Sequence, residues 1–317
     1  MDVFAGHRAL TRPLRAPAIT IGNFDGVHRG HAALIARARA LAAPNGGEAV
    51  VLTFDPHPTR VLAPAHAPPL VTTTARKLEL LASAGADAVV VEPFTRELAA
   101  LTADRFVDEI LAGALGARHV VVGADFIYGQ GRGDNVATLE AAGARHGFTV
   151  DVVAPVTVGG EVASSTRVRA HLRAGDPAAA AAVLGRPYDV DGVVVRGAGR
   201  GKGLGVATAN VAPDGALLAA PGIYAVTLAR EDGDGRALPA VASLGTNPTF
   251  VADGGLVLEV HVLDFDGDLY GARVRVGFVA WLRAEARFDT VDALLVQIHD
   301  DIARARARFA APPVAPR

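Results

Sequence analysis

Two different patterns of apolar and polar residues divide the chain near residue 184. In the first part, short apolar runs alternate with segments whose apolar residues recur every three or four positions. The runs predict strands and the recurring segments predict helices. The strands are expected at 18–22, 48–54, 88–91, 119–123 and 148–154, and the helices at 29–41, 74–84, 104–115 and 135–146. Strands that alternate with helices are typical of a parallel, doubly wound α/β sheet.

The second part follows a short helix and turn that we expect over 176–187. Its segments are rich in valine or alternate apolar with polar residues, and turns of Gly, Asp and Pro separate them. The segments are 188–195, 222–229, 238–244, 256–265 and 273–278. This order predicts an antiparallel β-barrel, and an amphipathic helix is expected after it, over 289–309. We therefore predict α/β plus β, with one domain over 1–184 and another over 185–317.

Composition excludes several classes of protein. The formal net charge of −2 argues against nucleic acid held by a basic face, and it leaves a local basic patch open. The absence of Cys excludes disulfides and thiol chemistry and fits the reducing cytoplasm. No apolar run is long enough to cross a membrane. We expect a cytoplasmic protein without nucleic-acid or membrane partners, and composition leaves the oligomeric state open.

The stretch IGNFDGVHRGH, residues 21–31, joins the first predicted strand to the first predicted helix. Its glycines let the main chain approach a ligand closely, and the free N–H groups at a helix start favour an anion. These glycines are Gly22, Gly26 and Gly30. His28 and His31 lie three residues apart, so both can donate to phosphate oxygens. Two ordinary polar histidines are the simpler alternative, and a zinc site is disfavoured because no Cys or further His stands nearby.

Two further polar clusters follow predicted strands. They are DPHP at 55–58 and GADFIYGQGRG at 123–133. Because ligands bind at the carboxyl ends of parallel strands, we expect these loops to converge with the histidine loop on one crevice.

The segment SSTRVR, residues 164–169, opens another helix. Ser and Thr are preferred as N-caps, which is one interpretation. The other adds Ser165, Thr166, and Arg167 or Arg169 as donors to phosphate groups, because a guanidinium binds phosphate in a bidentate way. The two interpretations are compatible.

The Gly-rich stretch RGAGRGKGLGVATAN, residues 196–210, fits neither the dinucleotide-binding nor the Walker A pattern. A plain flexible turn is the simpler alternative. Against it, Thr208 and Asn210 offer hard oxygen ligands of the kind that suit Mg²⁺ beside phosphates. The candidates for phosphate contact in this loop are Gly199, Gly201, Lys202 and Gly205.

The first motif resembles the GxFDGxHxGH signature of HxGH nucleotidyltransferases. Its matching positions are Gly22, Phe24, Asp25, Gly26, His28, Gly30 and His31. Together with TFDPHP, SSTRVR, LGRPY, GRGKGLGVATAN, SLGTNPTF and LEVHVLDFDGDLYG, it resembles the bacterial bifunctional riboflavin kinase/FMN adenylyltransferase family, also called FAD synthetases. The resemblance implies a Rossmann-like nucleotidyltransferase domain, followed by a six-stranded riboflavin kinase barrel with a C-terminal helix. It also implies ATP, riboflavin and FMN as substrates, with Mg²⁺.

The resemblance also implies roles for single residues. Adenylyl transfer would use His28 and His31, and Glu259 would be the base that activates the riboflavin hydroxyl. The alternation along its strand turns Glu259 away from apolar neighbours, although an exposed strand carboxylate is the simpler alternative. The flavin-binding candidates are Phe54, Pro56, Pro58, Asp125, Phe126 and Asn247, and Thr249 is a candidate to line the kinase site.

Three positions depart from the family pattern in the second half. Val206 and Ala207 replace the usual Phe and Pro, and Ser243 replaces the usual Asn. They suggest one alternative, an adenylyltransferase with an impaired kinase half. A non-catalytic flavin-binding module is the other, and it is disfavoured because binding riboflavin alone needs neither a base nor metal ligands.

Overall fold

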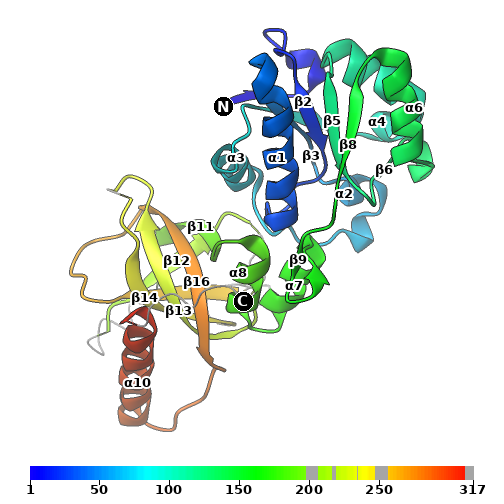
Figure 1. The fold of residues 1–317 in the computed structure, drawn as a ribbon. Helices are drawn as coiled ribbons and strands as arrows, with labels where there is room; N and C mark the ends of the chain where they lie inside the picture. Colours follow the sequence, from blue (N-terminus) through cyan, green and yellow to red (C-terminus); the bar gives the residue numbers. More distant parts are fainter. Residues whose placement is uncertain (198–205, 216–218, 234, 247–255, 311–317) are drawn as a thin grey trace. The chain divides into compact units, whose positions relative to one another are not determined.

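The computed structural model describes residues 1–197, 206–215, 219–233, 235–246 and 256–310, drawn in Figure 1. The chain forms two compact units, each described by itself. The first contains residues 1–69 and 74–163, and the second contains 70–73 and the chain from Ser164 onward. The predicted boundary at residue 184 therefore differs from the division by contacts, which groups the two helices before the barrel with the barrel.

The first unit is built on a six-stranded sheet in the order β1-β4-β3-β2-β5-β8. All its neighbouring strands are parallel, as predicted. The strands are β1 (Asp2–Phe4), β2 (Ala18–Ile21), β3 (Ala49–Asp55), β4 (Ala88–Pro93), β5 (His119–Gly123) and β8 (Thr149–Val153). The edge strand β1 was not predicted, because three residues are too few for a periodic pattern.

Helices cover both faces of this sheet. They are α1 (Arg29–Ala42), α2 (Pro58–Leu62), α3 (Thr74–Ser83), α4 (Arg96–Ala99), α5 (Ala103–Arg105), a π-helix (Phe106–Ala114) and α6 (Val136–His146). Short two-stranded pairs join β6 (Ile127–Tyr128) to β7 (Asp134–Asn135) and β9 (Thr157–Val158) to β10 (Glu161–Val162).

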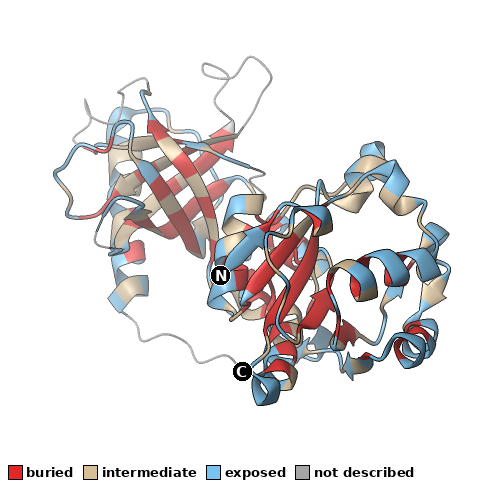
Figure 2. Cartoon of the chain, turned by 90° about the horizontal axis from the view of Figure 1, so that it is seen from above, coloured by how far each residue is buried: buried red, intermediate tan, exposed pale blue. Residues whose placement is uncertain are grey.

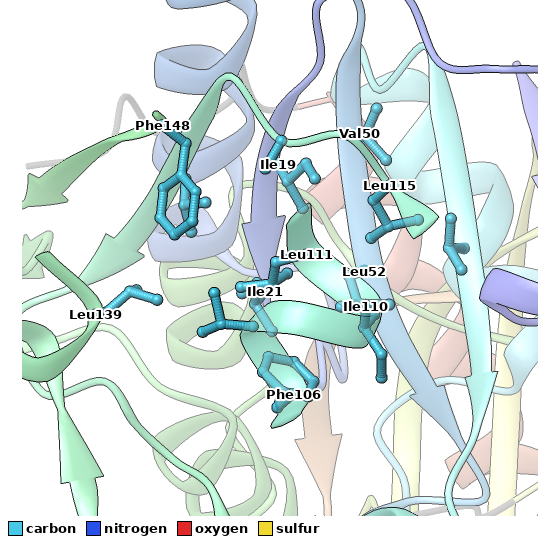
Figure 3. Packing of buried hydrophobic residues seen from close by; sticks show 14 of the residues in the cluster. Ile19, Ile21, Val50, Leu52, Phe106, Ile110, Leu111, Leu115, Leu139 and Phe148 are labelled. Atoms are coloured by element: carbon cyan, nitrogen blue, oxygen red, sulfur yellow. The ribbon is translucent and has the colours of Figure 1, made fainter. Parts of the chain in front are cut away.

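The central strands are mostly apolar because both of their faces are buried. Ile19 and Ile21 of β2 pack in the cluster that contains the π-helix, shown in Figure 3. Their neighbour Ala18 packs on the other face, against Ala38 of α1. Figure 2 shows the buried strands lying between partly exposed helices.

The order of the strands reverses beside β2. From β2 the chain adds β3 and β4 on one side, whereas β5 and β8 lie on the other side. In sheets of this kind, ligands bind outside the carboxyl ends of the strands at such a switch point. The loops after β2, β3 and β5, which carry the three predicted polar clusters, therefore leave the same edge of the sheet from adjacent strands.

The second unit is a closed barrel in the order β11-β12-β15-β14-β13-β16. Its strands are β11 (Tyr188–Val195), β12 (Ala209–Pro213), β13 (Gly222–Arg230), β14 (Leu238–Thr246), β15 (Leu256–Val262) and β16 (Arg273–Arg283). The antiparallel barrel is as predicted, and β12 is the strand that the pattern of valines missed. Two helices, α7 (Ser165–Arg173) and α8 (Pro177–Leu184), precede it.

The last described helix, α10 (Val291–Ala310), packs on the barrel close to where the sequence predicted it. Ala305 of α10 is buried against Ala225 of β13 and Leu263, which follows β15. The buried carboxylate of Asp301 also pairs with Arg283 of β16 at 2.7 Å. An apolar stripe and an ion pair thus fix the helix to one side of the barrel.

Candidate functional site

The loop between β2 and α1 presents the histidine motif at the middle of the sheet's carboxyl edge. His28 is the N-cap of α1. Phe24, Gly26 and Val27 have positive φ angles of 50°, 81° and 41°. Positive φ is costly for Phe and Val and persists only where the surroundings impose it, often at functional sites. Phe24 is fully buried, so the loop is anchored in the core beneath it.

His28 and His31 form a stacked pair. Their ring centroids lie 3.6 Å apart with the planes inclined by 21°. The main-chain N–H of His28 donates to Nδ1 of His31 at 3.3 Å. A Cβ on Gly30 would lie 3.1 Å from the His28 ring, so glycine leaves the room that the pair needs. The motif therefore builds two adjacent imidazoles at a helix N-terminus.

Both imidazoles are neutral near pH 7. His28 is 7% exposed, and this burial lowers its pKa from 6.5 to about 4. Burial also lowers the pKa of His31 well below 6.5, and the charge of protonated His28 and that of Lys77 lower it further. Because His31 accepts a hydrogen bond at Nδ1, its remaining N–H lies on Nε2. The pair therefore offers neutral N–H donors.

Sequence reasoning missed Lys77 of α3, which is 7% exposed. Its Nζ donates to the main-chain oxygens of Asn23 at 3.4 Å and Phe54 at 3.3 Å, and to Oγ1 of Thr53 at 3.2 Å. A signal was present, because position 77 lies three residues before the buried Leu80 and therefore on the apolar stripe of the helix.

The flavin-binding candidates of the first unit follow β3 and β5. Phe54 lies edge-on to Phe94, with ring centroids 5.6 Å apart. Pro56 and Pro58 come next, and Pro58 begins α2. On the other loop Asp125 is exposed, while Phe126 packs against the core and stacks on Tyr128 with centroids 5.5 Å apart. Their assignment to the flavin stays a prediction.

The segment 164–169 begins α7, in the second unit. Ser164 is the N-cap, and its Oγ accepts a hydrogen bond from the Arg167 N–H at 3.2 Å. Arg169 is buried, whereas Thr166 is exposed. The capping interpretation is thereby confirmed. The assignment of Ser165, Thr166, Arg167 and Arg169 to ATP phosphates stays a prediction.

In the barrel, the strand register places Glu259 in a row of neighbouring side chains. Glu259 of β15 pairs with Asn210 of β12 on one side and with Ser243 of β14 on the other. Ser243 pairs in turn with Ile223 of β13. Directly paired residues point to the same face of a sheet, so these side chains share one face. Along β15, Leu258 and its alternate neighbours are buried, and Glu259 is only partly buried.

Two cavities flank this row. One has a volume of about 570 Å³ and lies between the barrel and the helix α10. Its lining includes Glu259, Ser243, Val206 and Thr208, and the apolar Leu294 and Ile298 of α10. The other, of about 440 Å³, is lined by Thr208, Asn210, Gly197 and Tyr270 among others. Thr208 therefore borders both cavities, with Glu259 in the first and Asn210 in the second.

Two contacts hold the main chain in place around Thr208. Asn210 lies so close to Gly197 that any Cβ on Gly197 would overlap its amide. Nδ1 of His261 lies 2.8 Å from the main-chain oxygen of Ala207, to which it must donate because a carbonyl only accepts. His261 was not predicted, since its partner is 54 residues away in the sequence.

Several predicted residues lie outside the described part of the chain. They are Gly199, Gly201, Lys202, Gly205, Asn247 and Thr249. Among the described residues, no cluster of three or more His, Asp or Glu could hold a metal ion. No described helix has both the length and the apolar character to cross a bilayer.

Comparisons with known proteins cover both units. A family model described as FAD synthetase matches residues 11–167, and one described as riboflavin kinase matches residues 184–309. The bifunctional riboflavin kinase/FMN adenylyltransferase of Pseudomonas fluorescens is 41% identical over 312 residues, 98% of this chain and 99% of that protein. Its counterpart in Escherichia coli K12 is 38% identical over 304 residues, 96% of each.

A solved structure also matches, with a TM-score of 0.86 and 29% sequence identity. It is named as a macrolide-efflux protein from Streptococcus pneumoniae, and the match covers 96% of this chain and 98% of that one.

A parallel sheet with an HxGH loop, followed by a flavokinase-type barrel, defines a nucleotide-dependent transferase with two functional units. Such a protein carries out two different transfers within one chain. This chain belongs to the bifunctional riboflavin kinase/FMN adenylyltransferase family, because relatives more than 30% identical match it over nearly its whole length. The fold, the family and the two activities that the sequence predicted are thereby confirmed.

Proposed function

We propose that the residues described above carry the two reactions, which act in sequence on one flavin in the cytoplasm. The barrel unit converts riboflavin and ATP into FMN and ADP, and the first unit converts FMN and ATP into FAD and pyrophosphate. One observation carries the assignment of the kinase site: Thr208 borders both barrel cavities, and Glu259 lines the apolar one. A flavin and a nucleotide in these cavities would meet at Thr208.

Adenylyl transfer needs no protein base. A phosphate oxygen of FMN, already anionic at neutral pH, attacks the α-phosphorus of ATP, and the bond to the bridging oxygen of pyrophosphate breaks. Negative charge grows on the α-phosphate and on the leaving group. We assign His28 and His31 to donate N–H hydrogen bonds there, since donors fixed before the reaction stabilise charge that develops during it. The loop residues Asp25 and Gly26 are assigned to the same phosphates, whereas the N–H of Gly22 donates to the main-chain oxygen of Leu52 at 3.1 Å.

Riboflavin phosphorylation does need a base, because the attacking group is a neutral alcohol. The hydroxyl oxygen attacks the γ-phosphorus of ATP, ADP leaves, and the hydroxyl proton passes to the carboxylate of Glu259. The cavity has apolar walls that include Val206, Ile223 and Leu294, which suit a flat ring system, and Glu259 is one of several polar residues that also line it.

The oxygen atoms beside the second cavity fit Mg²⁺. The hydroxyl of Thr208 and the amide oxygen of Asn210 are hard ligands, and both residues line that cavity. Two protein ligands are enough for Mg²⁺, which usually keeps several waters and takes the rest from substrate phosphates. When bound, Mg²⁺ neutralises negative charge on the β- and γ-phosphates of ATP. Thr208 and Asn210 would hold it at the end of the cavity that adjoins Glu259.

Product analysis of two variants tests the proposal. Purified protein is incubated with ATP and MgCl₂ and with either riboflavin or FMN, and the flavins are separated by chromatography. His28→Ala should make FMN but lose FAD formation by on the order of 10²–10³. Glu259→Gln should lose FMN formation by on the order of 10²–10⁴ and keep FAD formation from FMN. Each variant is the folding control for the other.

Two outcomes would change the assignment. If Glu259→Gln still phosphorylates riboflavin at the parent rate, the base lies elsewhere. If the parent makes FAD from FMN but no FMN from riboflavin, the kinase half is impaired. Val206 and Ser243 would then be the first residues to revert, because both line the cavity with Glu259.

A further inference from the structure

Lys77 connects the ends of two neighbouring strands of the first unit. The oxygen of Asn23 belongs to the loop that follows β2, and Phe54 is near the end of β3. One ammonium donates to both of these oxygens, at 3.4 and 3.3 Å, and to Thr53. The Thr53 hydroxyl itself donates to the Asn23 oxygen at 3.1 Å. The histidine loop and the DPHP loop are thus held by one buried polar cluster.

Each N–H donor of the Lys77 ammonium has an acceptor within the protein. A lysine ammonium has three N–H donors, and Lys77 has three acceptors. Two of the acceptors are carbonyl oxygens that cannot donate in return, so the cluster favours the charged form although burial lowers the pKa of Lys77. With its donors engaged, Lys77 does not reach a substrate and acts through the residues that it holds.

Composition supports a specific need for lysine here. The chain has 31 Lys and Arg residues, and only two are Lys: this one and Lys202 in the Gly-rich loop. An arginine fork is planar and longer, so it cannot direct three donors from one compact atom. Lysine therefore stands at a buried position whose three acceptors suit a compact ammonium, in a chain that uses arginine at nearly every other basic position.

Charged groups of three residues lie near the ammonium of Lys77. The carboxylates of Asp25, in the histidine loop, and Asp55, at the end of β3, both raise the pKa of Lys77 and therefore lie near it. The charge of Lys77 also lowers the pKa of His31 in α1. The hydroxyl of Thr74, at the start of α3, donates to Asp55 at 2.8 Å and fixes the helix that carries Lys77. Without the ammonium, both carboxylates would lose a neighbouring positive charge.

We propose that Lys77 is a positioning residue for adenylyl transfer: it ties the loops after β2 and β3 together beneath the histidine pair and supplies a fixed positive charge there. This rests on the proposed role of the histidine pair. Since Lys77 does not touch substrate, its loss should lower kcat and leave KM nearly unchanged.

The test compares Lys77→Met with the parent in the full chain. We expect kcat for FAD formation from FMN to fall by on the order of 10², as for a small misplacement of reacting groups, with KM for FMN and ATP within about threefold. FMN formation from riboflavin, measured in the same sample, should be unchanged. The pKa of His31, followed by NMR of its ring, should rise because a nearby positive charge is gone.

Arg12→Met is the matched control. Arg12 donates to the buried Glu48 at 3.0 and 2.8 Å, just before β3 begins at the opposite edge of the same sheet. Its loss should lower stability without changing kcat or the pKa of His31, as expected of a structural cation. If Lys77→Met behaves in the same way, with kcat within about threefold of the parent, the proposal is wrong.

A second variant decides the case in which Lys77→Met does not fold. Thr53→Val is nearly isosteric and removes one acceptor of the ammonium while its charge stays. We expect kcat for FAD formation to fall by about tenfold with unchanged KM, and an unchanged kcat would overturn the proposal. If Lys77→Met and Thr53→Val keep their effects while His28→Ala remains fully active, the proposed role of the histidine pair fails instead.

Discussion

The burial of His28 should make the stability of the first unit depend on pH, and His28→Phe should remove that dependence. In the native state burial lowers the pKa of His28 from 6.5 to about 4. When the pH falls below 6.5, His28 becomes protonated in the unfolded chain, whereas it stays neutral in the native protein until the pH approaches 4. The stability contributed by a neutral His28 is therefore present above pH 6.5 and is lost as the pH falls toward 4.

The size of the effect follows from the same pKa values. Each unit of difference between the unfolded and native pKa values of His28 corresponds to about 1.4 kcal/mol, so the full loss of stability is about 3 kcal/mol. Between pH 7.5 and pH 5 the loss at His28 is about 2 kcal/mol. His28→Phe keeps an aromatic ring to stack on His31 and has no titrating group. His31 titrates in both proteins, but His28→Phe removes one charge that lowers the pKa of His31, so its acid loss is smaller in the variant and adds to the difference in the same direction.

Hydrogen exchange of the slowest amides of β2 and β3 measures the opening free energy of this unit. From pH 7.5 to pH 5 the parent should lose about 2 kcal/mol more than His28→Phe. His66→Phe, at an exposed position, controls for the loss of a histidine as such. Equal losses in the parent and His28→Phe would refute the burial of a neutral imidazole as the cause.

Three further substitutions have expected results. Gly30→Ala places a Cβ 3.1 Å from the His28 ring, so FAD formation should slow by about tenfold in a kinetic assay. Riboflavin phosphorylation by the same variant should stay unchanged, which shows that the protein is folded. Gly197→Ala should displace the Asn210 amide and raise the Mg²⁺ concentration needed for half-maximal kinase rate, and an unchanged requirement would remove Asn210 as a ligand. Asp301→Asn leaves the half-buried guanidinium of Arg283 without its buried anion, so thermal unfolding of the barrel unit should show a loss of about 3 kcal/mol, whereas a loss below about 1 kcal/mol would mean that the apolar stripe alone holds α10.

The order of helices and strands could be predicted because it depends on neighbours in the sequence. The four central strands of the first sheet, β2 to β5, are predicted by apolar runs, since both faces of a central parallel strand are covered. The edge strand β1 escaped prediction because Asp2 and Val3 are exposed, and only Phe4 of its three residues is buried. The strand β12 escaped because Ala209 and Asn210 resemble the end of a Gly-rich turn, and the barrel becomes closed only when both of its neighbours are present.

The motif residues of the candidate site could be named in advance for the same reason. His28, Gly30 and His31 lie within four residues, so their shared helix turn follows from local geometry. The partners of Lys77 and His261 could not be predicted, because each side chain acts on main-chain atoms that are distant in sequence. The predicted boundary at residue 184 also rests on a change of pattern, whereas α7 and α8 join the barrel unit through contacts.

By itself, the sequence determined the class of each half and the chemistry of its motifs, because periodicity and close spacing act over a few residues. Only the tertiary structure decided that Thr208 borders two cavities and that Glu259 lies between Asn210 and Ser243. Only the tertiary structure placed the ammonium of Lys77, with an acceptor for each of its three donors, beneath the histidine loop. These features depend on strand register and on side chains that meet across the fold, and no local pattern specifies such contacts.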